Sequence, residues 1–231
     1  MITVTLKRFS FFLFTLTLFS GVNGYAQQKT IHTMYGKSVA PAELTEGIKK
    51  IMEQYDVPGL SIAVINDSSL VYHNALGVSN IETKEPVDGQ SIFEGASLSK
   101  PIFAYFALKM VEEGKLDLDR PLYEYLPHPG FADESQEDAK LITARMVLAH
   151  QTGMPNHAFG KKMKLAFKPG TGFEYSGEAY QYLAAVIGKQ HGIGFKSDLN
   201  KLFEKKVTKP LKMPHSTFIW DNYVAQHKVY G

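Results

Sequence analysis

The chain has 231 residues, of which 44% are hydrophobic and 21% are charged, with a formal net charge of +2. This size and composition fit one globular domain, and the near-neutral charge gives no argument for binding nucleic acid or an anionic surface. The absence of cysteine excludes a disulfide framework, a thiolate nucleophile and a cysteine-ligated metal.

The N-terminus has the features of a secretory signal peptide. Lys7 and Arg8 precede an apolar run over residues 9–19, and small residues follow as far as Ala26. The apolar run is shorter than the ~20 residues that a membrane-spanning helix needs, so cleavage is favoured over an N-terminal anchor. We therefore expect a signal peptide over residues 1–26, a mature domain over 27–231, and a periplasmic or secreted location with no stable membrane span after cleavage.

The first predicted elements of the mature chain are a helix and a β-hairpin. Residues 41–55 carry apolar side chains at helical spacing, with Pro41 near the start, which predicts an amphipathic helix. Residues 60–65 and 70–76 are rich in β-formers, and turn residues at 66–69 separate them. Because a two-stranded sheet is marginal by itself, we expect this hairpin to need further strands.

The rest of the chain is mostly helical in pattern. An apolar run at residues 101–111 predicts a central helix, with Gly114 as its natural C-cap. The acidic stretch at 128–140 is expected to be a loop. A short helix is predicted to end at Leu126, and longer helices are predicted over 142–150, with Thr143 as the cap, over 178–190 and over 195–207. Residues 216–220 are expected to form one short strand, and no terminating element is expected at 229–231.

The tetrad Ser97-Leu98-Ser99-Lys100 lies at the start of the central helix. At helical spacing Ser97 and Lys100 share one face, and an ammonium group beside the positive end of the helix dipole favours a serine alkoxide. The same pattern also fits a capping Ser97 or Ser99 followed by a solvated lysine. Pro101 further disfavours helical geometry at the residue before it. These residues alone leave open whether the tetrad is a nucleophile or a cap.

Five short stretches stand out in chain order. They read V-P-G-L-S-I-A-V at 57–64, I-F-E-G-A-S-L-S-K at 92–100, G-K-L-D-L-D at 114–119, L-A-H-Q-T-G-M-P at 148–155 and P-G-T-G-F-E-Y-S-G at 169–177. Together they resemble the serine β-lactamase and penicillin-binding protein family, in its class C-like branch. The resemblance implies an α/β (α+β) fold of the β-lactamase/transpeptidase type, with an antiparallel sheet flanked by helices and a helical subdomain.

The resemblance also implies a catalytic site that works through an acyl-enzyme. Ser97 would be the nucleophile, Lys100 its activating partner, and Tyr175 a proton shuttle that acts as a phenolate. A tyrosine with a pKa near ~10 needs close positive charge to act as a base at neutral pH, and Lys100 could supply it. The alternative for Tyr175 is an ordinary buried aromatic with a hydrogen-bonded hydroxyl. No cofactor or metal is implied, and a structural hydrogen-bonding role is expected for His150.

Two departures from the family pattern affect the expected activity. The family's second motif is usually Tyr-x-Asn, and Tyr175 matches its tyrosine. The third position of this motif is Gly177 instead of asparagine, so the amide that family members offer to substrate is missing, although Glu178 could partly stand in. Nothing in residues 178–231 matches the third motif, which lies on a late strand in the family. We therefore expect the chain to correspond to a C-terminally truncated domain without the later sheet strands.

The sequence accordingly predicts a serine hydrolase that acts on a β-lactam, a D-amino-acid peptide or an ester. Its partner would be a small-molecule or peptidoglycan-derived substrate and not a nucleic acid. The alternative is a non-catalytic remnant or cell-wall-binding domain of the same fold. The sequence leaves the substrate and the oligomeric state open.

Overall fold

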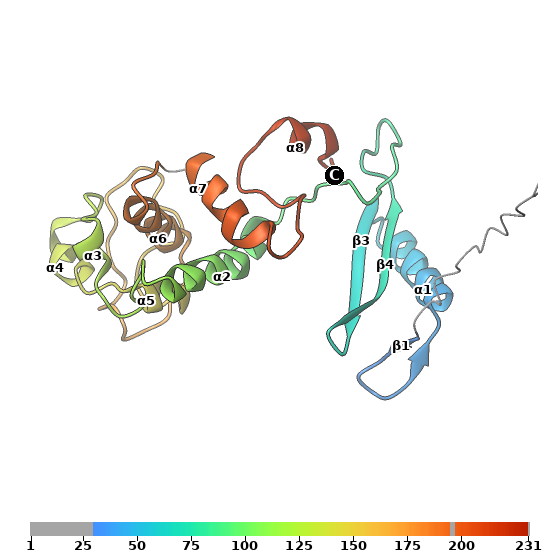
Figure 1. Cartoon of the computed structure of the whole chain (residues 1–231), viewed down its shortest axis with the longest axis horizontal. Helices are drawn as coiled ribbons and strands as arrows, with labels where there is room; N and C mark the ends of the chain where they lie inside the picture. Colours follow the sequence, from blue (N-terminus) through green and yellow to red (C-terminus); the bar gives the residue numbers. More distant parts are fainter. Residues whose placement is uncertain (1–29, 195–196, 231) are drawn as a thin grey trace, which may run out of the picture. The chain divides into compact units, whose positions relative to one another are not determined.

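The structure is a computed structural model that describes residues 30–194 and 197–230. The signal peptide expected over residues 1–26 lies outside these residues. The chain divides into two compact units, of which the first contains the chain up to Val57 together with Ser61–Asn74. The second contains Pro58–Leu60 and the chain from Ala75 onward (Figure 1).

The first unit is a helix packed on a β-hairpin. Helix α1 (Pro41–Gln54) begins at a proline, whose missing N–H would have no partner in the first turn in any case, and it buries Ile48. The Thr45 hydroxyl on α1 is 2.9 Å from the hydroxyl of Tyr72, a buried residue of the hairpin. The helix and hairpin predicted for this part of the chain are both confirmed.

The hairpin consists of β3 (Gly59–Asn66) and β4 (Ser69–Gly77), which pair with each other. Asp67 and Ser68 between them both have left-handed backbones, with φ of 48° and 58°, as a tight two-residue turn of the primed type requires. A second ladder joins β1 (Ile31–His32) to β2 (Ser38–Val39) in antiparallel register. Within residues 30–194 and 197–230, each sheet has two strands.

The second unit is built around α6 (Gly177–Gln190). This helix contacts four others, and its inward face is fully or almost fully buried, including Leu183, Val186 and Ile187 (Figure 1). Its partners are α2 (Ser99–Glu112), α3 (Leu122–Tyr125), α5 (Ala144–Leu148) and α7 (Ser197–Phe203).

Aromatic rings fill the space between these helices. Phe106 of α2 is fully buried, and its ring lies edge-on to Phe103 at 6.0 Å and to Phe203 at 5.8 Å between centroids. Such edge-to-face pairs stabilise a core by about 0.5–1.5 kcal/mol beyond the area they bury. The apolar spacing that predicted the central helix therefore reflects its buried face.

Caps define the ends of these helices as predicted. Gly114 follows α2 with a φ of +67°, which suits a glycine C-cap. The Thr143 hydroxyl accepts a hydrogen bond from Met146 N at 3.3 Å and caps α5. The Ser176 hydroxyl accepts one from Ala179 N at 3.0 Å and caps α6. These caps fix where α5 and α6 begin, and the residues just before α6 form part of the site described below.

The prediction of a loop over residues 128–140 is wrong in part. Two short helices, η2 (Asp133–Ser135) and α4 (Gln136–Ala139), lie within this range. The acidic residues that suggested a solvated loop occupy the first turns of these helices, where negative charge is favoured by the helix dipole. Lys140 also pairs with Glu137 at 2.6 Å.

The prediction of a strand over 216–220 is also wrong, because these residues form an irregular segment. The Phe218 N–H and the Thr217 hydroxyl both donate to the side-chain oxygen of buried Asn200, at 2.8 and 3.1 Å. The Asn200 side chain thus accepts the hydrogen bond that the Phe218 N–H would have donated to a neighbouring strand. The helix predicted over 195–207 is divided into α7 and the π-helical η3 (Glu204–Thr208), while residues 195 and 196 lie outside the described residues.

The described residues also include a late helix that the sequence did not predict. Helix α8 (Asn222–His227) is capped by Asp221, whose carboxylate accepts a hydrogen bond from Val224 N at 2.8 Å. Beyond α8, Lys228 forms a parallel bridge to Ile92 and Tyr230 forms one to Asn80. The two residues of each bridge lie far apart in the sequence, so no local sequence pattern could reveal these pairings.

Candidate active site

The candidate nucleophile lies where an irregular segment becomes helix. Ala96 has a left-handed backbone with a φ of 41°, a conformation that costs an alanine about 1–2 kcal/mol. It begins the short 3₁₀ helix η1 (Ala96–Leu98), which leads into α2. Pro101 falls in the first turn of α2, where its missing N–H does not break the helix. Ser97 is exposed at this junction.

The side chain of Lys100 reaches back over one turn to Ser97. Lys100 Nζ donates a hydrogen bond to Ser97 Oγ at 3.2 Å. The Ser97 hydroxyl is thus engaged by an ammonium group and does not act as a helix cap, and the N-terminus of α2 has no side-chain cap hydrogen bond. Positive charge at this distance stabilises the alkoxide more than the hydroxyl.

Tyr175 lies at the same place, brought there by the extended segment that precedes α6. The Lys100 ammonium is 4.6 Å from the centroid of the Tyr175 ring. Hydrogen bonds with the side chains of Lys100 and, to a lesser extent, Ser97 lower the pKa of the Tyr175 hydroxyl below its usual value of 10.0. The structure therefore brings together all three residues that the sequence singled out.

His150 packs against Tyr175 and is hydrogen-bonded to the segment that carries it. Its backbone is left-handed, with a φ of 57°, and its carbonyl accepts a hydrogen bond from Glu174 N at 2.9 Å. Its Nδ1 accepts from Ser176 N at 3.1 Å, and its ring lies 4.5 Å from that of Tyr175. Burial, and then the charge of Lys100, lower the pKa of His150. The imidazole is therefore kept neutral and structural, as the sequence predicted.

The structure also explains why the second motif contains a glycine. A Cβ on Gly177 would lie 2.8 Å from the Asn156 carbonyl oxygen and 3.1 Å from its side-chain oxygen. The loop that follows the stretch at 148–155 therefore occupies the space that a side chain at position 177 would need. The Glu178 carboxylate accepts a hydrogen bond from Ala158 N at 2.8 Å, so in this structure it is engaged in holding that loop. The sequence analysis did not single out Asn156, and its only related observation was the glycine at position 177, where the family has asparagine.

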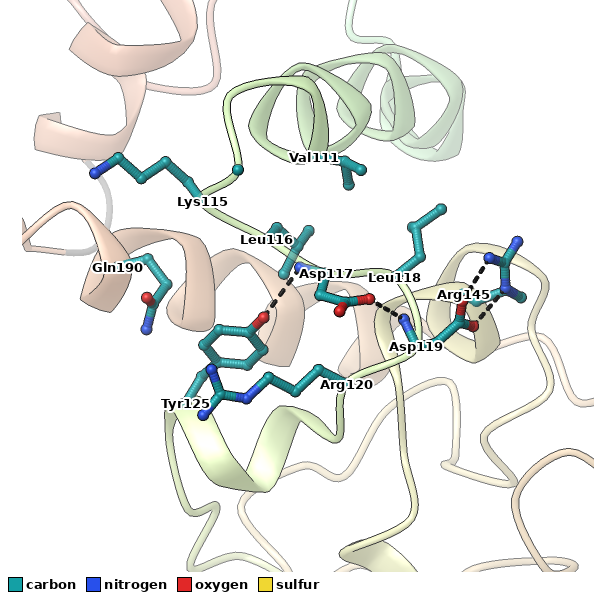
Figure 2. A pocket seen from close by; sticks show the side chains of 11 residues that line it. Val111, Lys115, Leu116, Asp117, Leu118, Asp119, Arg120, Tyr125, Arg145 and Gln190 are labelled. Atoms are coloured by element: carbon teal, nitrogen blue, oxygen red, sulfur yellow. Dashed lines mark hydrogen bonds and ion pairs between the residues drawn. The ribbon is translucent and has the colours of Figure 1, made fainter.

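A polar cavity of about 620 Å³ lies elsewhere in the second unit and is lined by the G-K-L-D-L-D stretch (Figure 2). Arg145 holds Asp119 through two bonds of 2.7 and 2.8 Å, and this pairing lowers the pKa of the carboxyl group. Asp117 accepts a hydrogen bond from Asp119 N and donates its own N–H to the Tyr125 hydroxyl. These charges and dipoles are directed at one another, which indicates that the stretch anchors the loop after α2.

No group of three or more His, Asp or Glu side chains in residues 30–194 and 197–230 is placed to hold a metal ion. Over the same part of the chain, no helix combines the length and apolar character needed to span a bilayer.

Known proteins resemble this chain over most of its described length. Protein flp of Staphylococcus aureus is 24% identical over 202 residues, which cover 80% of this chain and 39% of that protein. The D-alanine carboxypeptidase AmpC from Burkholderia cenocepacia is 26% identical in sequence, with a TM-score of 0.67 over 80% of this chain and 52% of its own. A class C beta-lactamase is 24% identical, with a TM-score of 0.68 over 81% and 53%.

These likenesses show a β-lactamase/transpeptidase-like fold, which confirms the fold class predicted from the five stretches. The chain spans about two-fifths of the length of the curated relative and about half that of the two solved structures. The family model described as Beta-lactamase matches residues 44–230. The chain therefore belongs to the beta-lactamase family.

Proposed function

We propose that this protein is a serine hydrolase that forms an acyl-enzyme on Ser97. One observation carries the proposal: a single ammonium group, that of Lys100, contacts both the Ser97 hydroxyl and Tyr175, and it lowers the pKa of the tyrosine. A nucleophile within hydrogen-bond reach of a base whose pKa is shifted toward neutrality is the arrangement that covalent catalysis uses.

In the proposed reaction, Ser97 Oγ attacks a carbonyl carbon while its proton passes to the Tyr175 phenolate, which Lys100 stabilises. The tetrahedral intermediate then collapses, the bond to the leaving group breaks, and Tyr175 returns the proton to that group. Water subsequently attacks the ester on Ser97 with Tyr175 as the base, which releases the acid and regenerates the serine. The helix dipole of α2 favours the negative charge that develops near Ser97.

The substrate classes that fit this chemistry are β-lactams, D-amino-acid peptides and esters. The likeness to a D-alanine carboxypeptidase and to a class C beta-lactamase supports this range, since the first enzyme's name refers to D-alanine and the second's to a β-lactam. Export to the periplasm or beyond the cell, with removal of residues 1–26, belongs to the same proposal. The alternative, a non-catalytic or cell-wall-binding domain of the same fold, makes the opposite prediction for covalent labelling.

Covalent labelling tests the proposal directly. Residues 27–231 should be labelled by a fluorescent penicillin or a fluorophosphonate probe, and peptide mapping should place the adduct on Ser97. The Ser97→Ala variant should lose the label, whereas Ser99→Ala should keep most of it, because it is the Ser97 hydroxyl that accepts the hydrogen bond from Lys100. Equal labelling of Ser97→Ala and the unaltered protein would refute the assignment, and no labelling of the unaltered protein would favour the non-catalytic alternative.

A further inference from the structure

His150 holds the segment that carries Tyr175 by hydrogen bonds on both sides of that residue. The His150 carbonyl accepts from Glu174 N at 2.9 Å, and its Nδ1 accepts from Ser176 N at 3.1 Å. These two N–H groups belong to the residues immediately before and after Tyr175. A change in the position of His150 is therefore passed directly to the backbone of the tyrosine.

The His150 ring also positions the Tyr175 ring. The two centroids are 4.5 Å apart at an interplanar angle of 31°, and the Tyr180 ring lies 5.3 Å from the same imidazole at 34°. The Lys100 ammonium contacts these two tyrosine rings as well, at 4.6 and 5.7 Å. Because Tyr175 is 38% exposed, these contacts rather than burial keep its ring beside the ammonium group.

The hydrogen bond from Ser176 requires a neutral imidazole. A backbone N–H can only donate, so Nδ1 of His150 must offer a lone pair, and the proton of the neutral ring lies on Nε2. Protonation of Nδ1 sets two donors against each other, and the hydrogen bond is lost. Burial, and then the charge of Lys100, lower the pKa of His150 below 6.5, so the bond persists at neutral pH and is lost in acid.

The charges around the ring oppose one another. An imidazolium at His150 is repelled by Lys100 of α2 and attracted by a phenolate at Tyr175. Tyr180 of α6 stays neutral because burial raises its pKa, and the exposed Glu174 meets His150 through its backbone N–H. With these charges in opposition, the loss of the backbone hydrogen bond to Nδ1 decides what protonation does to the segment.

We infer that His150 is a positioning residue for the proposed base Tyr175, and that protonation of its imidazole releases the segment and turns the site off in acid. The inference rests on the proposed function and adds its regulation by pH. Two protonation events then limit the rate, because Tyr175 must lose a proton and His150 must not gain one. The rate falls about tenfold per pH unit where only Tyr175 titrates, and about a hundredfold per unit where both titrate.

The variant His150→Asn separates the two protonation events. Asparagine carries an acceptor oxygen near the place of Nδ1, tolerates the left-handed backbone of this position, and does not titrate. The matched control is His128→Asn, because His128 Nδ1 also accepts from a backbone N–H, that of Gly130 at 3.0 Å, and burial also lowers its pKa. A second variant, His150→Gly, suits the same backbone but removes both the acceptor and the ring.

The measured quantity is the second-order rate constant for fluorophosphonate labelling of Ser97 between pH 5 and pH 8, with the folded fraction followed by circular dichroism. We expect the steeper fall below about pH 6.5 in the unaltered protein and in His128→Asn. His150→Asn should instead keep a fall of about tenfold per unit throughout. At pH 8, His150→Gly should label about tenfold more slowly than His150→Asn, the range for loss of one hydrogen bond.

Two results would overturn this inference and leave the proposed function intact. One is a fall of about tenfold per unit down to pH 5 in the unaltered protein. The other is a steep fall that persists in His150→Asn while the protein remains folded. If the unaltered protein is not labelled at any pH, the proposed function fails and the inference fails with it.

Discussion

Single residues set the chemistry of the candidate site through one shared cation. The Lys100 ammonium contacts both the Ser97 hydroxyl and Tyr175, and it lies 5.7 Å from the ring centroid of Tyr180 as well. The two tyrosines nevertheless differ in their pKa shifts. The pKa of Tyr175 is lowered by the side chains of Lys100 and Ser97, whereas burial raises that of Tyr180. Of these two tyrosines, Tyr175 is therefore the better suited to be the proposed base.

Replacing Tyr175 with phenylalanine should remove that base. The phenolate is the reactive form, so the labelling rate of the unaltered protein should rise with pH and level off at the Tyr175 pKa, below the usual 10.0. In Tyr175→Phe we expect the rate to fall by ~10²–10⁴ and this rise to disappear. Fluorophosphonate labelling between pH 6 and pH 10 measures both effects.

The matched control is Tyr180→Phe. The Tyr180 ring lies 5.3 Å from that of the same histidine, and its hydroxyl donates a hydrogen bond to the Leu148 carbonyl at 3.4 Å, but burial raises its pKa. This variant should keep the rate and the pH profile. A Tyr175→Phe variant that keeps both would show that another group accepts the serine proton.

At the scale of elements, tight turns present the motif residues to one another. Gly153, in the H-Q-T-G stretch, has a φ of +72°, and its carbonyl accepts a hydrogen bond from Ala166 N at 2.9 Å. A Cβ at this position would lie 2.5 Å from the Phe167 carbonyl oxygen. The turn therefore needs a glycine for its backbone conformation and also for close backbone approach.

The pair Gly153→Ala and Gly160→Ala separates these two requirements. Gly160 has a similar φ of +76°, but nothing lies within 4 Å of its Cβ position. Gly160→Ala should lower the free energy of unfolding by about 1–2 kcal/mol through backbone strain alone. Gly153→Ala should lower it by at least about 1 kcal/mol more, because the chain must shift away from Phe167. Urea unfolding of both variants measures the difference, and equal losses would contradict a steric role for Phe167.

For the protein as a whole, two half-buried histidines are expected to make the stability depend on pH. Burial lowers the pKa of both His128 and His150 below 6.5. The unfolded chain then binds protons more readily than the folded one, so the stabilisation is complete above about pH 6.5 and is lost as the pH falls toward the folded-state values.

We therefore expect the free energy of unfolding to decrease between pH 7.5 and pH 5.5. His128→Gln should be less stable at pH 7.5, because the ring packs against Phe131 and Tyr182 at 5.2 and 4.9 Å between centroids. It should also show a shallower pH dependence, since one titrating group is gone. Chemical unfolding at four pH values provides the comparison, and an unchanged slope in His128→Gln would rule out this residue as a source of the acid sensitivity.

The hairpin of the first unit has consequences for association. Within the described residues β3 and β4 pair only with each other, and Ile65 and Leu70 near the turn are 67% and 58% exposed. Open strand edges with exposed apolar side chains promote pairing between chains. We expect residues 27–231 to self-associate in sedimentation velocity, and Ile65→Lys to shift the distribution toward monomer.

Tyr35→Lys is the control for this prediction, because Tyr35 is 92% exposed and lies outside the hairpin. It should change the distribution little. Finding the unaltered protein monomeric at all concentrations tested would contradict the prediction.

The sequence by itself determined where several helices begin and end, and its resemblance to the family pointed to the candidate catalytic residues. Pro41 at the start of α1, Gly114 after α2 and Thr143 at the start of α5 act within one helical turn. Their effect on backbone conformation can therefore be read from a few neighbouring residues. Ser97 and Lys100 lie three residues apart, so a helical turn was enough to bring their side chains together.

Only the tertiary structure decided where distant segments meet. The N–H of Phe218 bonds to a side chain 18 residues away, which replaced the expected strand. The Asn156 amide occupies the space beside Gly177, which is 21 residues further along the chain. Such contacts depend on how whole helices and loops pack, and no local preference encodes them. For this reason the sequence revealed that position 177 lacks a side-chain amide, while the tertiary structure was needed to show that Asn156 packs against Gly177.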